Sequence, residues 1–232
     1  MNKKISVMQP YFFPYLGYWQ LLHEVDTFIC FDDVNFINKG WINRNKIIMN
    51  GQETMITLNL SKASQNKKIN EIDIFGNNES MLKTIDLSYR RSLNYLLLMP
   101  ILEGILRFEE KNLAIFLANS IHKISALLKI NTTIISSSEF GLPFSGKEKI
   151  IPMCKVQNGA HYVNPIGGID LYKHDEFNAH GLRLSFLQSD ILPYSQNSKL
   201  FISKISIIDF LMNVAEENWT KHLNSYRLID NV

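Results

Sequence analysis

The chain has 232 residues, a length that one α/β domain can occupy. Hydrophobic residues make up 46% of it and charged residues 20%, which excludes the composition of a disordered chain. The 24 Lys and Arg against 22 Asp and Glu leave a formal charge of +2, so the charge gives no indication of nucleic-acid binding.

The apolar stretches are too short for a membrane span or a secretion signal. Residues 95–106 contain Pro100 and Gly104 and fall short of the ~20 residues that a spanning helix needs. The first apolar run stops at Gln9 and Pro10, before a signal peptide could form. Cys30 and Cys154 lie in apolar surroundings, so we expect buried, reduced thiols in a cytoplasmic protein.

The pattern of the first 31 residues predicts a strand, a loop, a helix and a second strand. Residues 5–8 are an apolar run that ends at Gln9 and Pro10, and the aromatic loop, residues 11–18, follows directly. Helical spacing continues from Trp19 to residue 25, and residues 27–31 form a second β-rich run. Two apolar strands joined by a short crossover indicate a parallel βαβ unit, with ligand-binding loops at the carboxyl ends of its strands.

The later elements complete an α/β pattern. Asn50-Gly51 predicts a hairpin between residues 41–49 and 54–60. Helical periodicity covers residues 80–107, with a kink or break expected at Pro100, and residues 112–129. Further strands are predicted at 132–137, 161–164 and 182–187, and further helices at 149–157, 175–179 and 205–213. We therefore expect one α/β domain, residues 1–232, with a mainly parallel sheet, flanking helices, a β-hairpin and a helical subregion at about 80–129.

The aromatic loop carries the first group of candidate binding residues. It has neither the three-glycine dinucleotide fingerprint nor the ending of a P-loop. Residues 8–18 are similar to a degenerate form of the HxGH signature of nucleotidylyltransferases, with Tyr15 and Tyr18 at the positions of the histidines. This similarity implies a nucleotidylyltransferase-like (HUP) α/β core and a nucleotide or diphosphate pocket; alternatively, the aromatic residues are core residues of a tight turn. The candidates are Gln9, Tyr11, Pro14, Tyr15, Gly17 and Tyr18.

Asp32 and Asp33 follow the second predicted strand and are the first catalytic candidates. Such carboxylates could bind a metal, a ribose or a substrate amine, or act as a base. Because adjacent strand residues point to opposite faces, we expect only one of the two to enter a given pocket. An N-cap or a solvated turn is the alternative. Since both segments lie at carboxyl ends of neighbouring strands, we expect the aromatic loop and the acidic pair to line one cleft.

Two further segments could bind a ligand with rings and phosphates. Residues 41–45 offer a stacking ring and amides on one face of the strand, Trp41, Asn43 and Asn45, while Arg44 could clamp a diphosphate or be an ordinary surface arginine. Ser145 and Lys147 open a predicted helix and could form an anion site, although an N-cap with Glu148 as capping-box partner explains them equally well.

The segment after the strand at 161–164 supplies the last candidates. Asn164, Gly167 and Gly168 would let the backbone approach a ligand closely, or simply form a tight turn. His161 begins this strand, and it is the one histidine that we place near the site, as a catalytic candidate. The histidines are too scattered to predict a metal site, and the sequence indicates no cofactor.

Taken together, five segments resemble the WbqC-like family: residues 8–18, 31–36, 40–45, 162–168 and 206–209. The resemblance runs from Ile5 to about Met212. It implies a transferase that N-acylates or aminoacylates, for instance glycylates, a nucleotide-linked amino-dideoxy sugar in O-antigen, lipopolysaccharide or other surface-polysaccharide biosynthesis. The donor would be an activated amino acid or an acyl thioester. The resemblance supplies no catalytic residues to carry over.

In the resulting hypothesis, the aromatic loop and Trp41 stack on a base or sugar, and Arg44 and residues 145–147 hold the diphosphate. Asp32 or Asp33 accepts the proton of the attacking ammonium. The alternatives are a nucleotide-sugar-binding protein without catalysis and a nucleotidylyltransferase that uses tyrosines. Expected partners are a small-molecule nucleotide sugar and its acyl donor, without nucleic acid or a membrane span, and exposed aromatic clusters would favour a homodimer.

Overall fold

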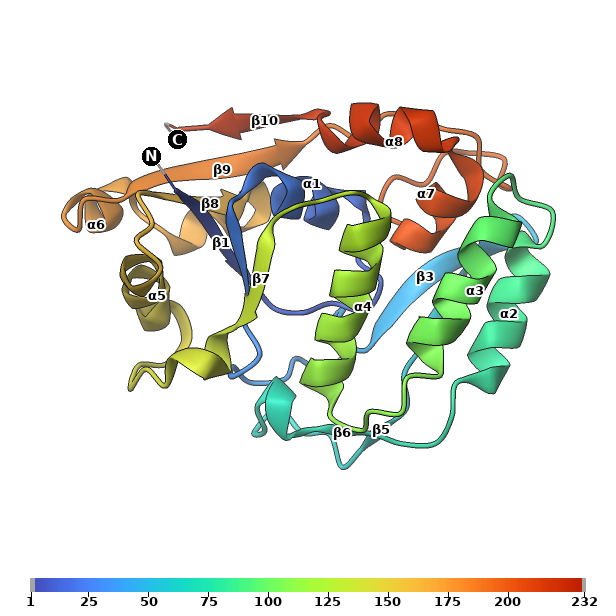
Figure 1. Ribbon diagram of the computed structural model, residues 1–232, viewed down its shortest axis with the longest axis horizontal. Coiled ribbons are helices and arrows are strands. Elements are labelled where there is room, and N and C mark those ends of the chain that lie inside the picture. The colour runs from blue at the N-terminus through green and yellow to red at the C-terminus, as the bar shows by residue number, and fades with distance from the viewer. Residues whose placement is uncertain (1–2, 231–232) are drawn as a thin grey trace.

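The computed structural model describes residues 3–230, and within them six strands form one sheet (Figure 1). The strand order is β10-β9-β8-β1-β2-β7, and only β10 runs antiparallel to its neighbour. This arrangement confirms the predicted α/β class with a mainly parallel sheet. The strands are β1 (Lys4–Met8), β2 (Thr27–Cys30), β7 (Thr133–Ser136), β8 (His161–Pro165), β9 (Arg183–Ser189) and β10 (Tyr226–Ile229).

The chain winds in both directions from the central strand β1. It first passes through β2 to β7 on one side, then returns to β8 and β9 on the other. Helices α1 (Leu16–Glu24) and α4 (Leu113–Leu127) cover one face, whereas α5 (Ile150–Val156) and α6 (His174–Asn178) pack on the opposite face. The order reverses between β1 and β8, and ligands of such sheets bind at the carboxyl ends of the strands beside this reversal.

The predicted hairpin is present as β3 (Arg44–Met49) and β4 (Gln52–Thr57). Its turn residues Asn50 and Gly51 both have positive φ, 52° and 77°, as a two-residue hairpin of the favoured twist requires. A second small pair, β5 (Leu60–Ser61) and β6 (Asp73–Ile74), was not predicted, because two-residue strands have no periodicity to detect.

Residues 80–107 form two helices where the sequence predicts one with a kink or break at Pro100. Helices α2 (Glu79–Tyr89) and α3 (Tyr95–Leu106) are separated at residues 90–94, and Pro100 lies inside α3. The break follows from Asn94, whose backbone N–H donates to the Met212 carbonyl and whose amide donates to the carbonyls of Leu211 and Val214. These contacts tie the corner to a distant segment, which local sequence patterns do not contain.

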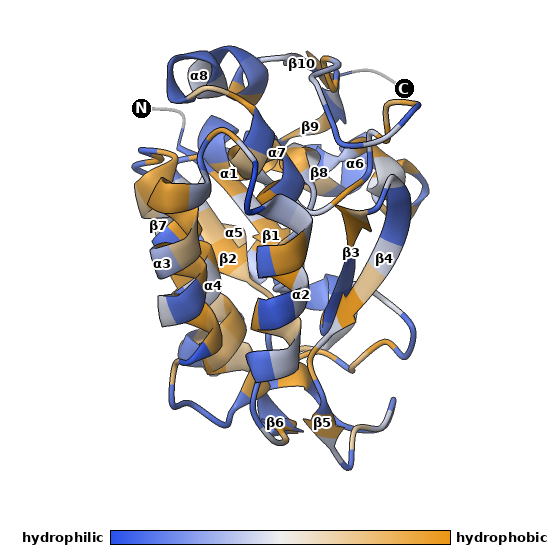
Figure 2. Ribbon diagram, turned by 90° about the vertical axis from the view of Figure 1, so that its right-hand side faces the viewer, coloured by the Kyte–Doolittle hydropathy of each residue, from blue (hydrophilic) through white to orange (hydrophobic). Residues whose placement is uncertain are grey.

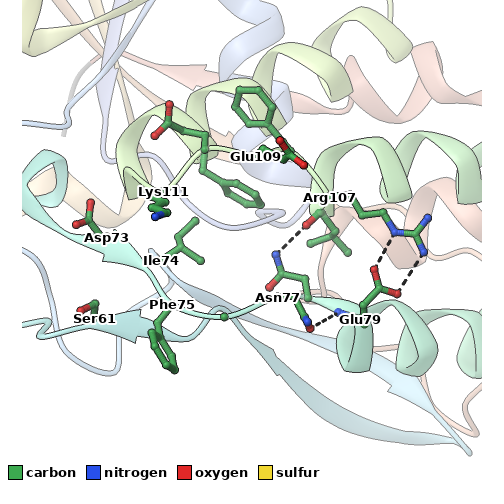
Figure 3. Close-up of a pocket in the computed structure, with 15 residues that line it drawn as sticks. Ser61, Asp73, Ile74, Phe75, Asn77, Glu79, Arg107, Glu109 and Lys111 are labelled. Carbon is green, nitrogen blue, oxygen red and sulfur yellow. Dashed lines mark hydrogen bonds and ion pairs between the residues drawn. The ribbon is translucent and has the colours of Figure 1, made fainter.

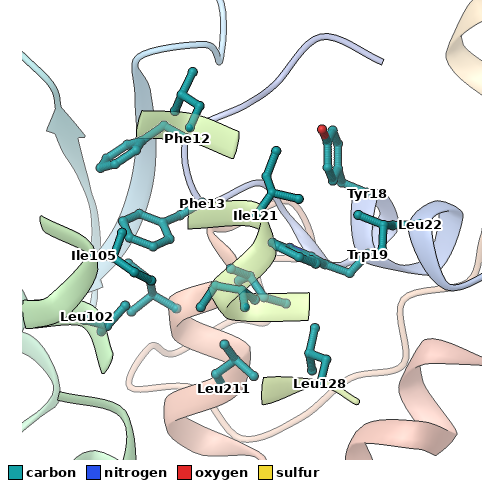
Figure 4. Packing of buried hydrophobic residues seen from close by; sticks show 14 of the residues in the cluster. Phe12, Phe13, Tyr18, Trp19, Leu22, Leu102, Ile105, Ile121, Leu128 and Leu211 are labelled. Carbon is teal, nitrogen blue, oxygen red and sulfur yellow. The ribbon is translucent and has the colours of Figure 1, made fainter. Parts of the chain in front are cut away.

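Helices α7 (Ile207–Asn213) and α8 (Glu216–Leu223) precede β10 and close the side of the sheet that carries α1, whereas the 3-10 helices η2 (Ser137–Phe140) and η4 (Ile166–Leu171) pack on the side of α5 and α6. Two further 3-10 helices are η1 (Ile69–Glu71) and η3 (Gly146–Lys149). Phe12 and Phe13 of the aromatic loop are completely buried in the core cluster that also holds α3 and α4 residues (Figure 4). Among residues 3–230, no helix combines the length and apolarity that crossing a membrane requires.

Candidate functional site

The aromatic loop is held in place by side chains that come from distant parts of the chain. The amide of Asn45 on β3 donates to the carbonyls of Phe12 and Phe13, at 3.0 and 2.8 Å. The Ser206 hydroxyl, which also caps α7, donates to the same Phe13 carbonyl at 2.9 Å. Phe13 has a φ of 43°, an unfavourable value for a bulky side chain. Backbone strain of this kind is enriched at ligand sites, where the surrounding structure enforces it.

This loop and β3 enclose a cavity of about 210 Å³. Trp41 is 43% exposed, so its indole is accessible to a ligand. The cavity brings together five of the binding residues predicted from sequence, and it adds one lysine that the sequence did not single out. Its lining is Tyr11, Pro14, Tyr15, Trp41, Asn45 and Lys204.

The two cavity tyrosines are neutral hydrogen-bonding groups. Burial raises the pKa of Tyr11, and it also raises the pKa of Tyr15 against the opposing effect of a hydrogen bond with Ser189. Both phenols therefore stay protonated at physiological pH and can donate one hydrogen bond each. Gly17 lets helix α1 begin close behind them, because a Cβ there would lie 2.5 Å from both Ser189 Oγ and Tyr15 Cε2.

Tyr18 and Gln9 do not line this cavity. The Tyr18 ring is buried in the core, and its hydroxyl donates to the Gln9 carbonyl at 3.2 Å. Desolvation raises its pKa well above the ordinary value, so the phenol is neutral. The expectation that Tyr15 and Tyr18 act as a pair is therefore corrected, because the first turn of α1 directs one ring to the cavity and the other into the core.

Arg44 and Asn43 have structural partners close by. The Arg44 guanidinium donates to the carbonyls of Gly40 at 3.1 Å and of Lys39, the turn that precedes Trp41. Asn43 donates its amide to the Leu58 carbonyl at 2.9 Å. Arg44 is also absent from the cavity lining, so in this structure it supports the turn, and the expected diphosphate clamp stays a prediction.

Lys204 reaches the cavity from the segment that precedes α7, and a buried carboxyl anchors this region. Asp209 accepts hydrogen bonds from the hydroxyls of Tyr89, at 2.9 Å, and Tyr194, at 3.0 Å. Burial raises the pKa of Asp209, while these hydrogen bonds oppose the shift. Because Tyr194 belongs to the same connection between β9 and α7 as Lys204, the network fixes the segment that carries the lysine.

Asp32 lies in a shell of hydrogen-bond donors beside β7. Its carboxylate accepts from the Ser137 hydroxyl and the Ser138 backbone N–H, both at 2.9 Å, and from the Ser138 hydroxyl at 2.7 Å. It thereby helps to fix the start of η2, whose N-cap is Ser136, so Asp32 is neither the local N-cap nor the solvated turn that the sequence offered as the alternative.

Asp33 forms an ion pair with Lys149, and both side chains are largely buried, at 10% and 7% exposed. Its other oxygen lies 2.5 Å from the Ser137 hydroxyl, which also contacts Asp32. The expectation that the two carboxylates point to opposite sides is therefore wrong, because β2 ends at Cys30 and strand alternation stops before them.

The acidic pair and the aromatic loop lie at the same edge of the sheet, but their side chains point to different places. The backbone at the end of β1 and the backbone just after β2 are adjacent, since the Phe31 N–H donates to the Met8 carbonyl at 2.7 Å. From there the carboxylates turn toward β7 and Lys149, while the loop turns toward β3. Neither carboxylate lines the cavity, so the expectation of one shared cleft is corrected.

Residues 145–147 do not form the anion site at a helix start that the sequence suggested. Ser145 and Lys147 are exposed, and the Ser145 side chain makes no capping hydrogen bond. Gly146, with a φ of 50°, opens a 3-10 turn instead, and α5 begins only at Ile150. Lys149, two residues beyond the predicted motif, is the lysine that points into the protein.

The glycine segment lies at the carboxyl end of β8, next to β1. The Asn164 side chain is buried, and a Cβ on Gly168 would lie 2.1 Å from its Nδ2 atom, whereas Gly167 has open space. His161 sits at the opposite end of the strand, about 13 Å away at ~3.3 Å per residue. It contacts Ser185 at 2.6 Å there, so its expected place beside the glycine turn is corrected.

A larger hollow of about 930 Å³ lies in the helical subregion, far along the chain from the aromatic loop (Figure 3). Its wide opening is bordered by Phe75, Lys111 and the ion pair between Arg107 and Glu79. It contains none of the residues from the carboxyl edge of the main sheet, so we place the candidate site at the smaller cavity. Within residues 3–230, no three His, Cys, Asp or Glu side chains are grouped as metal ligands would be.

Comparisons with known proteins agree with this picture at the level of the family. The profile of the WbqC-like protein family matches residues 9–221. The uncharacterized protein Rv1507c of Mycobacterium tuberculosis is 25% identical over 220 residues, which cover 93% of this chain and 95% of that protein. No solved structure matches the chain. Since the profile match spans nearly the whole sequence and includes the aromatic loop, β3 and Lys204, the chain belongs to the WbqC-like protein family.

Proposed function

We propose that the protein is an N-acyl or aminoacyl transferase that binds a nucleotide-linked amino-dideoxy sugar in the cavity between the aromatic loop and β3. The observation that carries this proposal is the cavity itself, in which three aromatic rings, an amide and a lysine converge. Aromatic faces stack on bases and sugars, and a lysine at the rim suits a phosphate. Its volume is below the ~300–1,000 Å³ of a pocket that encloses a whole drug-sized ligand, so it would enclose one ring of the nucleotide sugar.

The groups around the cavity suit a ligand with one ring and adjacent negative charge. Lys204 is exposed and has none of the ion pairs found among residues 3–230. Helix α1 begins at Leu16, immediately after Tyr15, and no side chain caps its first turn. The free N–H groups of a helix start favour anions. We infer that Lys204, together with the start of α1 next to Tyr15, would supply the positive potential that a diphosphate needs beside the aromatic rings.

In the proposed reaction, the amino nitrogen of the sugar attacks the carbonyl carbon of the acyl donor. A C–N bond forms, the bond from the carbonyl carbon to the leaving thiolate or nucleotide breaks, and one proton leaves the nitrogen. Because the cavity encloses only one ring, the amino sugar would extend from it along the carboxyl edge of the sheet toward Asp33, the largely buried carboxylate paired with Lys149. We assign the proton to Asp33, so that Asp33→Asn should lower turnover by about a hundredfold or more. Its affinity for the sugar nucleotide should stay unchanged, since Asp33 does not line the cavity.

A second candidate function is binding without catalysis. It is favoured by one observation, that Asp32 and Asp33 are both engaged by hydroxyl groups, a backbone N–H or Lys149. Under this alternative the protein would present a nucleotide sugar to another enzyme. The two functions share the cavity and differ in whether the isolated protein forms the amide.

One experiment separates them. The protein is titrated with a dTDP-linked 4-amino-4,6-dideoxy sugar while tryptophan fluorescence is followed, and the mixture is then supplied with acyl thioesters and ATP plus amino acids and analysed by mass spectrometry. A transferase gives a fluorescence change and an N-acylated product, whereas a binder gives the fluorescence change alone. No fluorescence change at millimolar ligand would refute both.

The fluorescence signal has a matched control within the chain. Trp41 is exposed at the cavity, whereas Trp19 and Trp219 are buried. In Trp41→Phe the ligand-dependent change should disappear, because the remaining indoles have no access to the ligand. A change that persists in this variant would show that the ligand binds elsewhere.

A further inference from the structure

Helix α3 is apolar on both sides, although only one side is covered. Its inner side chains are buried against α2 and α4, as expected for a core helix. On its outer side, Leu96 and Leu97 are 86% and 38% exposed, and Leu93, in the turn just before the helix, is 67% exposed. A helix that is apolar all round normally has partners all round, and exposed apolar stripes of this kind mark interaction surfaces. Figure 2 shows α3 with apolar turns at the edge of the molecule.

The outer stripe has the spacing of a helix-pairing seam. Within α3, Leu97, Pro100 and Gly104 follow one another at intervals of three and four residues, the pattern that keeps one face toward a partner helix. Leu93 precedes them in the turn before the helix and extends the stripe at its amino end. Residues 92–102 contain no charged side chain. Gly104 has open space around the position of a Cβ, so a partner could approach the backbone closely there.

We propose that this stripe, residues 93–104, is the interface with a second copy of the same chain, in which the two α3 helices pack antiparallel across a two-fold axis. A two-fold interface pairs a surface with itself, which suits a stripe whose charges are confined to its ends. The ends of the stripe are complementary in charge. Arg90 and Arg91 are exposed at the amino end, and the carboxyl end carries an excess of acid: Glu79, Glu103, Glu109 and Glu110 against Arg107 and Lys111.

The antiparallel arrangement follows from these charges. It places the arginines of one copy beside the acidic end of the other, whereas a parallel pair would place arginines on arginines. In the antiparallel arrangement the dipoles of the two α3 helices also point in opposite directions, so that they attract each other. The axis would pass between Leu97 and Pro100, so that Leu93 of one copy faces Gly104 of the other.

The interface would extend beyond one helix, because stable dimers bury ~1,200–2,000 Å² in total. The two helices that pack beside α3 each carry a further exposed apolar residue, Leu87 on α2 and Ile115 on α4. None of these residues lines the cavity of the candidate site, so the inference does not depend on the proposed function.

The first test is the mass in solution, measured by light scattering after size exclusion at about 50 µM, a concentration at which an interface of this size should be occupied. We expect a dimer for the wild type and a monomer for Leu96→Glu. The matched control is Leu200→Glu, which changes a leucine that is 81% exposed in another part of the chain and should stay dimeric. A monomeric wild type, or a dimer that survives Leu96→Glu, would overturn the proposal.

The second test reads the direction of the helices and does not depend on a destabilising charge. Leu93→Cys and Gly104→Cys variants are mixed and oxidised. The native Cys30 and Cys154 are buried, and burial raises the pKa of both thiols to about 12, so they stay unreactive. We expect a covalent dimer from the mixture and none from Leu93→Cys alone.

Two outcomes would contradict this geometry. Cross-linking of Leu93→Cys with itself would indicate parallel helices. A wild type that is monomeric and floats with vesicles of anionic phospholipid, in a manner that Leu96→Glu abolishes, would show that the stripe binds a membrane surface rather than a second copy. Circular dichroism of each variant establishes that the fold is retained.

Discussion

The ion pair between Asp33 and Lys149 should make a measurable contribution to the stability of the edge where β2 and β7 end. Both side chains are about nine-tenths buried, so neither charge can be solvated when its partner is removed. Lys149→Met keeps the length and the apolar stem of the side chain and leaves Asp33 as an unpaired buried carboxylate. Breaking one side of a buried pair costs about 3–5 kcal/mol of unfolding free energy. For a chain of this size that corresponds to a loss of roughly 6–20 °C in Tm.

The assay is urea unfolding of the wild type, Lys149→Met, Asp33→Asn and the double variant, followed by circular dichroism at pH 7. Each single variant should lower the midpoint without changing the slope. The double variant should recover most of the loss, because it leaves neither charge unpaired. Losses below about 1 kcal/mol in the single variants, as at an exposed pair, would refute the view that this pair is buried and structural.

Two further predictions use matched pairs of residues. Gly168→Ala should lower the free energy of unfolding by about 1–3 kcal/mol, because the added Cβ would displace the Asn164 amide. The control Gly167→Ala should change the free energy of unfolding by no more than about 0.5 kcal/mol, since the space around its Cβ is open. Equal losses for the two variants in urea unfolding would contradict the close packing of Gly168 against Asn164. Burial lowers the pKa of His161, so the unfolded chain binds a proton at this residue more readily than the folded protein does. The free energy of unfolding should therefore fall as the pH drops through about 6.5 toward the lower pKa of the folded state. In thermal scans from pH 5 to 8, His161→Gln should flatten this pH dependence, whereas the control His122→Gln, at an exposed histidine, should leave it unchanged.

The parts of the fold that rest on local patterns could be predicted from the sequence. The two apolar runs around the aromatic loop are β1 and β2, and Asn50-Gly51 forms the turn of the β3–β4 hairpin. The break between α2 and α3 could not be predicted at its observed position. It depends on hydrogen bonds from Asn94 to α7 and its flanking residue, more than a hundred residues away, while Pro100 is tolerated in a helix with one exposed side.

The sequence allows several residues of the candidate site to be predicted, but not which of them lie together in the structure. Tyr11, Tyr15 and Trp41 stand out as rings in turns, and the structure brings them into one cavity. No motif or periodicity in the sequence points to Lys204, a lysine in an irregular connection. Asp33 was expected beside the rings, but its pairing with Lys149 depends on how the turn after β2 meets η3, just before α5.

The central claim is that the cavity between the aromatic loop and β3 receives one ring of a nucleotide sugar. A crystal structure of the protein with a dTDP-linked amino-dideoxy sugar tests it most directly. We expect a ring of the ligand against Trp41 and Tyr11 and a phosphate oxygen at ~2.8 Å from Lys204 Nζ. A ligand bound in the hollow beside Phe75 and Lys111, or at residues 145–147, with the aromatic cavity empty, would contradict the claim.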